Sequence, residues 1–137
     1  MVAKRKASTV LSLATKKPAA PLESVEQRHF VARVRTDPRT RDLLWTATAN
    51  GGLRHKATAG RMKAEGVNAG VPDLLFFDPF GGYTGLAIEM KRRPNKPTAE
   101  QSAWLDKLMH RQWRCAVCYS SEEAWAVLAN YLGLDRP

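Results

Sequence analysis

The sequence is poor in cysteine and contains no long apolar run, and each of these shortages excludes a class of protein. Its two cysteines among 137 residues make neither a disulfide scaffold nor a four-ligand zinc site. No apolar stretch approaches the ~20 residues that a membrane-spanning helix requires. The apolar stretch near the N-terminus is also too short for a secretory signal. We therefore expect a cytoplasmic protein that has no membrane partner.

Acidic residues are also scarce, because 22 Lys and Arg residues outnumber 13 Asp and Glu residues and give a formal net charge of +9. Such an excess is typical of proteins that bind a polyanion, most commonly nucleic acid. Residues 1–20 contain no acidic residue at all. Pro18 and Pro21 break any helix in this stretch, so we expect residues 1–21 to form a flexible basic arm. Residues 22–137 are expected to form a single domain.

The spacing of apolar residues after position 21 predicts an α/β fold. The expected order is helix, strand, helix, strand, strand, helix, strand and helix, and Phe30 and Val34 mark the inward face of the first helix. Thr98 and Gln101 match a capping box, so a helix is expected to begin there. The cysteines lie in an apolar strand, Trp113–Tyr119, and are expected to be small core side chains. We expect one mixed sheet of about four strands flanked by helices.

Charged residues at the ends of two neighbouring predicted strands have the composition of a site for a divalent cation. Asp73 begins one strand, and Glu89 and Lys91 share one face of the next because side chains alternate along a strand. Two carboxylates are hard oxygen ligands that suit Mg²⁺ or Mn²⁺ beside a phosphate, and the Met90 carbonyl can supply a further oxygen. A lysine next to them orients a water or stabilises charge on the phosphate oxygens. The pattern predicts phosphodiester cleavage, with a surface salt bridge between Glu89 and Lys91 as the alternative interpretation.

Pro72-Asp73 together with Glu89-Met90-Lys91 resembles the PD-(D/E)xK nuclease signature. The wider sequence, roughly residues 22–133, resembles one branch of it, the VRR-NUC family of small phage, bacterial and repair-associated nucleases. The resemblance rests on the segments Asn50–Arg54, Lys63–Asp73, Gly85–Lys91, Glu100–Leu105 and Cys115–Tyr119. It implies a restriction-endonuclease-like fold, dependence on Mg²⁺ or Mn²⁺, and hydrolysis of phosphodiester bonds in DNA that is often branched or otherwise structured.

The resemblance also implies roles for individual residues. Asp73 and Glu89 would be the metal ligands, and Lys91 would orient the attacking water or stabilise the transition state. Gln101 matches a glutamine of the family that lies near the active site, although the same residue also completes the capping box. These two roles of Gln101 are left open at this point.

The family further has an acidic or amide residue on its first helix, and this chain offers two candidates. Gln27 lies three and seven residues before Phe30 and Val34 and therefore shares their inward face. Glu23, one turn earlier, lies on that face too. Glu26 is turned away by about 100° per residue and is the poorer candidate.

Basic residues close to the nuclease motif predict a surface that contacts nucleic-acid phosphates. The alternative for each of them is a solvated basic face. The predicted contacts are Asn50, Arg54, Lys56, Arg61, Lys63, Arg92, Arg93 and Lys96.

The function that we expect is divalent-metal-dependent cleavage of DNA, in particular of branched DNA such as a four-way junction formed in repair. Symmetric cutting of a junction by so small a domain would require a homodimer. One alternative is a basic protein that binds nucleic acid without cutting it. Another is the same chemistry on RNA or on specific duplex sequences.

Overall fold

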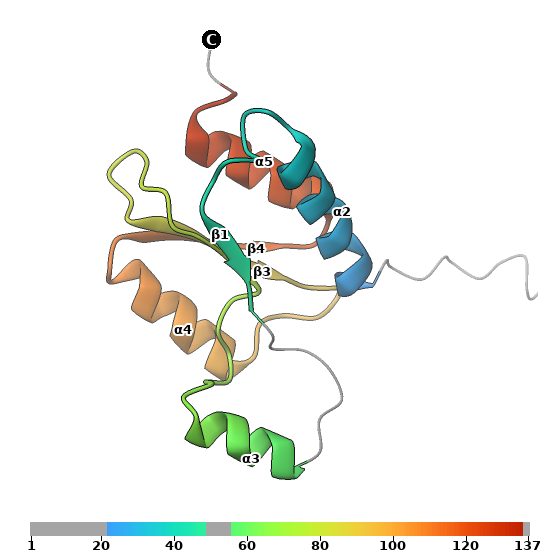
Figure 1. Ribbon diagram of the computed structural model, residues 1–137, viewed down its shortest axis with the longest axis vertical. Helices are drawn as coiled ribbons and strands as arrows, with labels where there is room; N and C mark the ends of the chain where they lie inside the picture. The colour runs from blue at the N-terminus through green and yellow to red at the C-terminus, as the bar shows by residue number, and fades with distance from the viewer. Residues whose placement is uncertain (1–21, 49–55, 136–137) are drawn as a thin grey trace, which may run out of the picture.

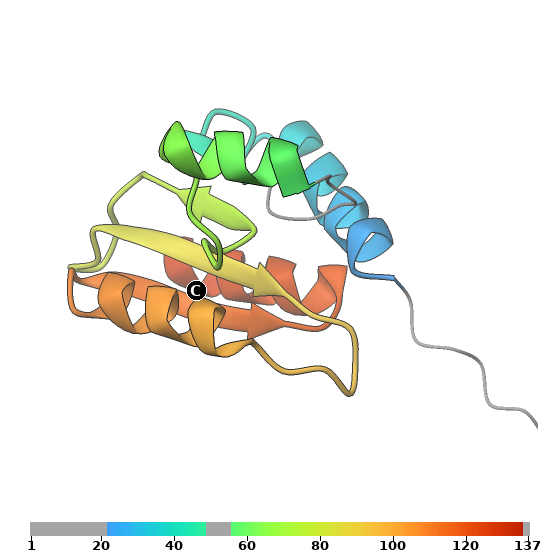
Figure 2. The same cartoon turned by 90° about the horizontal axis from the view of Figure 1, so that it is seen from below.

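The computed structural model describes residues 22–48 and 56–135, in which a four-stranded sheet lies between helices (Figures 1 and 2). α2 and α5 pack against each other on one face of the sheet, and α4 covers the other face. The expected arm, residues 1–21, lies outside the described residues. The elements in chain order are α2 (Glu23–Thr36), β1 (Trp45–Ala47), α3 (Lys56–Ala64), β2 (Leu74–Phe76), β3 (Gly85–Met90), α4 (Ala99–Met109), β4 (Trp113–Cys118) and α5 (Ser121–Leu132).

The predicted order of elements and the mixed sheet are both confirmed. The strands lie in the order β1-β2-β3-β4, with the β1–β2 and β2–β3 pairs antiparallel and the β3–β4 pair parallel. A parallel pair requires a crossover connection, and α4 provides it. α4 itself begins at the predicted capping box, in which the Thr98 side chain accepts a hydrogen bond from the backbone N–H of Gln101.

β3 is an interior strand of the sheet, and all six of its residues are buried. Leu86, Ile88 and Met90 belong to the core between the sheet and the helices α2 and α5. Because alternate side chains share a face of a strand, the Glu89 side chain points to the opposite face, toward α4. The fold therefore carries a carboxyl group on its most enclosed strand.

Aromatic side chains close the core beside α2. Phe30 of α2 meets Phe76 of β2 edge to face, with ring centroids 6.2 Å apart. Trp45 of β1 stacks on the same Phe76 ring at 5.9 Å. Phe30 and Val34 are both buried, which confirms the predicted inward face of this helix.

Both cysteines are free, and burial determines their chemistry. It raises the pKa of the Cys115 thiol to about 11 and that of the Cys118 thiol to about 12. Thiols of this kind are unreactive at neutral pH. Cys118 belongs to the core as expected, whereas Cys115 is only partly buried. Among the helices of the described residues, none has the length and apolar character needed to cross a lipid bilayer.

The backbone at Gly70 lies directly against the first turn of α4. A Cβ atom at this position would lie 2.7 Å from the carbonyl carbon of Glu100 and 2.8 Å from its oxygen. Gly70 also has a φ of +88°, a conformation that glycine adopts far more easily than other residues. The segment that leads into β2 and the start of α4 are therefore held in contact by the absence of a side chain.

We expect Gly70→Ala to destabilise the protein more than Gly82→Ala. Gly82 has nearly the same φ, +84°, but a Cβ atom there would have no atom within 4 Å. Both variants carry backbone strain of about 1–2 kcal/mol, whereas only Gly70→Ala adds a steric clash of about 1–3 kcal/mol. Urea unfolding measures the two losses in the free energy of unfolding. Equal losses would mean that the close approach of Gly70 to α4 is no constraint.

Candidate active site

The antiparallel pairing of β2 and β3 brings the two predicted carboxyl groups together. Asp73 directly precedes β2, and Glu89 is the penultimate residue of β3. Because Leu74 pairs with Ile88, Asp73 lies opposite Glu89 in the same register. Oδ2 of Asp73 accepts a hydrogen bond of 2.7 Å from the backbone N–H of Met90. The carboxyl groups of Asp73 and Glu89 are close enough to share a hydrogen bond when one is protonated.

The surroundings of this pair disfavour negative charge. Only 2% of the Glu89 side chain is exposed, and burial together with the Asp73 carboxylate raises the pKa of Glu89 to about 8. Burial also raises the pKa of Asp73, although the Met90 N–H partly opposes this effect. Oε2 of Glu89 is buried and has no hydrogen-bond partner among the described residues. An ionised Asp73 cannot provide one, because a carboxylate only accepts hydrogen bonds, whereas a cation would satisfy both groups.

The other oxygen of Glu89 is fixed by two side chains. Oε1 lies 3.8 Å from Nζ of Lys91 and accepts a hydrogen bond of 3.1 Å from Nε2 of Gln101. The amide oxygen of Gln101 accepts the backbone N–H of Thr98 at 2.9 Å. Gln101 therefore caps α4 and contacts Glu89 at the same time, so the two roles left open by the sequence coexist. The Lys91 side chain is only 10% exposed, and its pair with Glu89 is not a surface salt bridge.

Of the two candidates on the first helix, Glu23 is the one that contacts the site region. Its Oε1 accepts a hydrogen bond of 3.1 Å from the backbone N–H of Arg92, which follows the site lysine. The negative charge of Glu23 also adds to the burial effect that raises the pKa of both site carboxyl groups. Gln27 is half-buried one turn further along α2, and its side chain forms no hydrogen bond within the part of the chain that the structure describes.

The oxygen donors gathered here fit an open site for a hard divalent cation. Asp73 and Glu89 offer carboxylate oxygens, and the Met90 carbonyl lies on the same side of β3 as its N–H, which faces Asp73. Within residues 22–48 and 56–135, no group of three or more His, Cys, Asp or Glu side chains is arranged to hold a metal. Mg²⁺ does not need such a cage, because one or two carboxylates, water and a substrate phosphate commonly complete its coordination.

Thr48 contributes to the site region, although the sequence pattern does not single it out. Its Oγ1 donates a hydrogen bond of 2.8 Å to the Pro72 carbonyl, and its backbone N–H donates one of 2.9 Å to the Asp73 carbonyl. The two bonds fix the backbone that carries the first carboxylate. A polar residue at the end of an apolar run is the only sequence signal for this position, and it is a weak one.

The predicted nucleic-acid contacts lie on two segments and partly outside the described residues. Those at least partly exposed on α3 or on the loop after β3 are Arg61, Lys63, Arg92, Arg93 and Lys96. Those outside the described residues are Asn50 and Arg54, together with the side chain of Lys56. The guanidinium of Arg93 already binds Glu123 at 3.1 Å and lies 4.2 Å from the centroid of the Tyr119 ring. Arg93 therefore ties the loop after β3 to the start of α5.

Comparisons with known proteins agree with this fold. The model of the family described as VRR-NUC domain matches residues 19–122 of the chain. A solved structure titled "VRR_NUC domain protein" is similar, with a TM-score of 0.72 and 23% sequence identity. The similarity covers 84% of this chain and 91% of that one, and it confirms the fold that the sequence led us to expect. No curated protein sequence matches the chain.

We expect Mg²⁺ or Mn²⁺ to raise the melting temperature of the protein and Asp73→Asn to remove most of this increase. A ligand at a hundred times its Kd stabilises the folded state by about 2.7 kcal/mol. Above pH 8, where Glu89 is largely ionised, the metal-free Asp73→Asn variant should melt at a higher temperature than the wild type, because one of two repelling charges is removed. Differential scanning calorimetry measures both changes.

Asp106→Asn is the matched control for this experiment. Asp106 is exposed on α4, so the same substitution there leaves both the repulsion and the metal effect unchanged. If Mg²⁺ stabilises Asp73→Asn as strongly as it stabilises the wild type, the cation does not bind between these carboxylates.

Proposed function

The chain belongs to the VRR-NUC domain family, a family of nucleases, and on this premise we propose that it is a metal-dependent DNA endonuclease. The observation that carries the proposal is the buried pair of carboxyl groups, Asp73 and Glu89, beside the ammonium group of Lys91. Buried charges are costly for a protein that only has to fold. The same set of groups is what metal-assisted hydrolysis of a phosphodiester uses.

Asp73, Glu89 and the Met90 carbonyl are the groups that would hold Mg²⁺ or Mn²⁺. When bound, the cation supplies a Lewis acid that withdraws charge from the scissile phosphoryl group and from the leaving oxygen. The contribution of the protein is to keep the two carboxylates together before the substrate arrives. The Met90 N–H holds Asp73, and the Gln101 amide holds Glu89, so no reorganisation is needed during the reaction.

Lys91 is the residue that we assign to the reacting atoms. Its ammonium group lies beside Oε1 of Glu89 at the end of β3, where it can donate hydrogen bonds to the attacking water or to a phosphate oxygen. In a site from which most water is excluded, such a donor stabilises developing negative charge far more than it would in bulk water.

Gln101 and Glu23 are positioning residues in this proposal. The Gln101 amide occupies Oε1 of Glu89, which leaves Oε2 for the cation. Glu23 accepts the N–H of Arg92 and thereby fixes the backbone immediately after the site lysine. Gln27 stays a prediction from the family resemblance, because no contact ties it to the carboxylates.

DNA is the substrate that we favour, in a branched form such as a four-way junction. The net charge of +9 supports a polyanionic partner. A domain of this size covers one strand at a time, so symmetric cutting of a junction would use two copies related by a two-fold axis. RNA and specific duplex sequences are alternative substrates for the same chemistry.

We expect Lys91→Ala to lower the cleavage rate constant by about 10²–10³-fold, because a preorganised donor to the reacting phosphate is lost. The Kd for DNA should change little, because this donor is assigned to charge that develops in the transition state. Single-turnover cleavage in Mg²⁺ and fluorescence anisotropy measure the two quantities. Lys107→Ala, which removes an exposed lysine of α4, is the control and should cut as fast as the parent. Undiminished cleavage by Lys91→Ala would refute the role of this lysine.

A second experiment compares substrates for the same enzyme preparation. We expect a four-way junction to be cut faster than a linear duplex, a flap or RNA, with paired incisions in opposite strands. Denaturing electrophoresis of end-labelled strands measures the rates and the positions of the cuts. Faster cleavage of RNA or of plain duplex would replace the proposed substrate, and binding without cleavage of any substrate would favour a non-catalytic protein.

A further inference from the structure

A groove of about 380 Å³ lies where the C-terminal half of α2 meets β1, the edge strand of the sheet. We call it the β1 groove. No acidic side chain is among the described residues that line it. Its lining residues are Val31, Arg35, Arg41, Trp45, Thr46 and Ala47.

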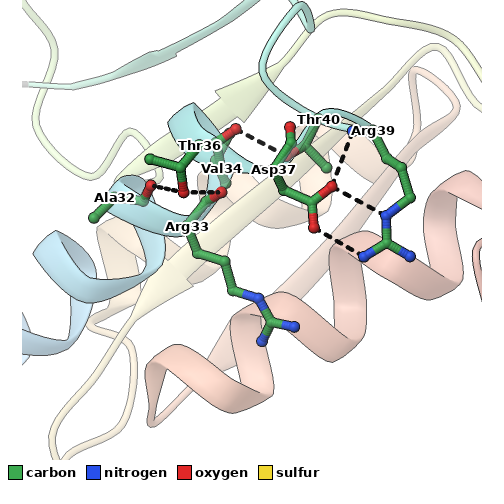
Figure 3. A network of polar contacts seen from close by, with 7 residues as sticks. All are labelled: Ala32, Arg33, Val34, Thr36, Asp37, Arg39 and Thr40. Carbon is green, nitrogen blue, oxygen red and sulfur yellow. Dashed lines mark hydrogen bonds and ion pairs between the residues drawn. The ribbon is translucent and has the colours of Figure 1, made fainter.

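Two neighbouring arginines are already engaged elsewhere. Arg33 lies over the ring of Trp125 in α5, 3.9 Å from its centroid. Arg39 binds the carboxylate of Asp37 through two guanidinium hydrogen bonds of 3.0 and 2.8 Å, and its backbone N–H donates a third of 2.9 Å (Figure 3). The hydrogen bonds from Arg39 lower the pKa of Asp37 to about 2. This carboxylate is therefore paired with Arg39.

Arg35 and Arg41 differ from this pair, because both residues line the β1 groove. Both residues are exposed, and neither forms an ion pair within residues 22–48 and 56–135. Asp42 follows Arg41 in the chain but makes no ion pair with it. The groove thus presents two uncompensated guanidinium groups, and their fork of N–H donors matches the oxygens of a phosphate.

The aromatic ring in the groove favours backbone contacts over base stacking. Trp45 stacks on Phe76 on one side, and the guanidinium carbon of Arg35 lies 5.4 Å from the ring centroid. A ring with both of these neighbours is a poor platform for a nucleobase. Its role is to support Arg35 and hold that side chain at the rim of the groove.

β1 leads from the groove to the candidate active site. The strand advances by about 3.3 Å per residue, so Trp45 and Thr48 are about 10 Å apart. Thr48 is hydrogen bonded to the carbonyl groups of Pro72 and Asp73. Because nucleotides rise by about 3.4 Å along one DNA strand, this distance corresponds to about three of them.

We propose that the β1 groove binds the phosphate backbone of the nucleic acid about three nucleotides from the scissile bond. The inference rests on the proposed function, because it takes DNA as the substrate. Arg35 and Arg41 fix the register of the strand relative to the carboxylates and read no sequence, since phosphates are the same at every step.

The test measures DNA affinity without cleavage. Full-length protein is titrated against a fluorescein-labelled duplex by anisotropy, in the absence of divalent cations and over a series of salt concentrations. Arg35→Gln and Arg41→Gln should each weaken binding about tenfold, as the loss of one charged hydrogen bond does. Each should also reduce the slope of log affinity against log salt by about 0.9. Arg35→Lys, which keeps the charge, should retain most of the slope.

Arg111→Gln is the matched control, because it removes the same charge from an exposed arginine just after α4, the helix that covers the other face of the sheet. It should leave the salt slope unchanged. If the two groove variants bind DNA as this control does, the proposal is overturned. It is also overturned if they change only the oligomeric state measured by light scattering, since the groove would then be an interface between copies.

The same data separate this proposal from the proposed catalysis. If DNA binding depends on Arg35 and Arg41 but the wild type cuts no DNA in Mg²⁺, the result supports DNA binding by the groove. The same result refutes the proposed nuclease activity. If the wild type and both groove variants bind DNA with equal affinity and cut it at the same rate, the groove does not bind DNA. The proposed nuclease activity would then still hold.

Discussion

The forced proximity of Asp73 and Glu89 is the constraint on which the site depends. Two like charges held side by side and away from water repel one another strongly, and burial together with this repulsion raises the pKa of Glu89 to about 8. Such a pair stays together only where the surrounding structure holds both side chains in place. Here the β2–β3 register, the Met90 N–H and the Lys91 ammonium fix it from three directions. In the proposed function a bound cation relieves this repulsion, so the proposed metal affinity and the instability without metal are two consequences of one geometry.

The fold supports this pair by placing Glu89 on the best-packed strand. The core residues on one side of β3 anchor the backbone, so the carboxyl group on the other side cannot withdraw into solvent. That other side is covered by α4, whose first turn is held against the segment preceding β2 by the contact between Gly70 and Glu100. Gln101, the residue after Glu100, reaches Glu89 from this turn. Gln101 thus links the capping of α4 to the orientation of the Glu89 carboxylate.

The positions of Asp73, Glu89 and Lys91 could be predicted from the sequence because they follow from local rules. Alternation along a strand puts Glu89 and Lys91 on one face, and a short connection implies antiparallel neighbours that bring Asp73 alongside. The double role of Gln101 could not be predicted in the same way. It depends on the distance between α4 and β3. Gly70 lies against the first turn of that helix, and a single glycine gives no periodic signal in the sequence. Local geometry is thus readable from the pattern, whereas packing between distant segments is not.

The arginines at the end of α2 illustrate the same limit. In the sequence they form one arginine-rich stretch, and only the structure separates Arg39, which pairs with Asp37, and Arg33, which lies over Trp125, from Arg35 and Arg41, which line the β1 groove. This division bears on the free edge of the sheet, because an unpaired strand invites another chain to pair with it. β1 is only three residues long and has two guanidinium groups beside it, and both features oppose strand addition. The same charges attract phosphates. The guanidinium groups that oppose pairing of β1 with another protein strand therefore also make this edge suitable for binding a nucleic-acid backbone.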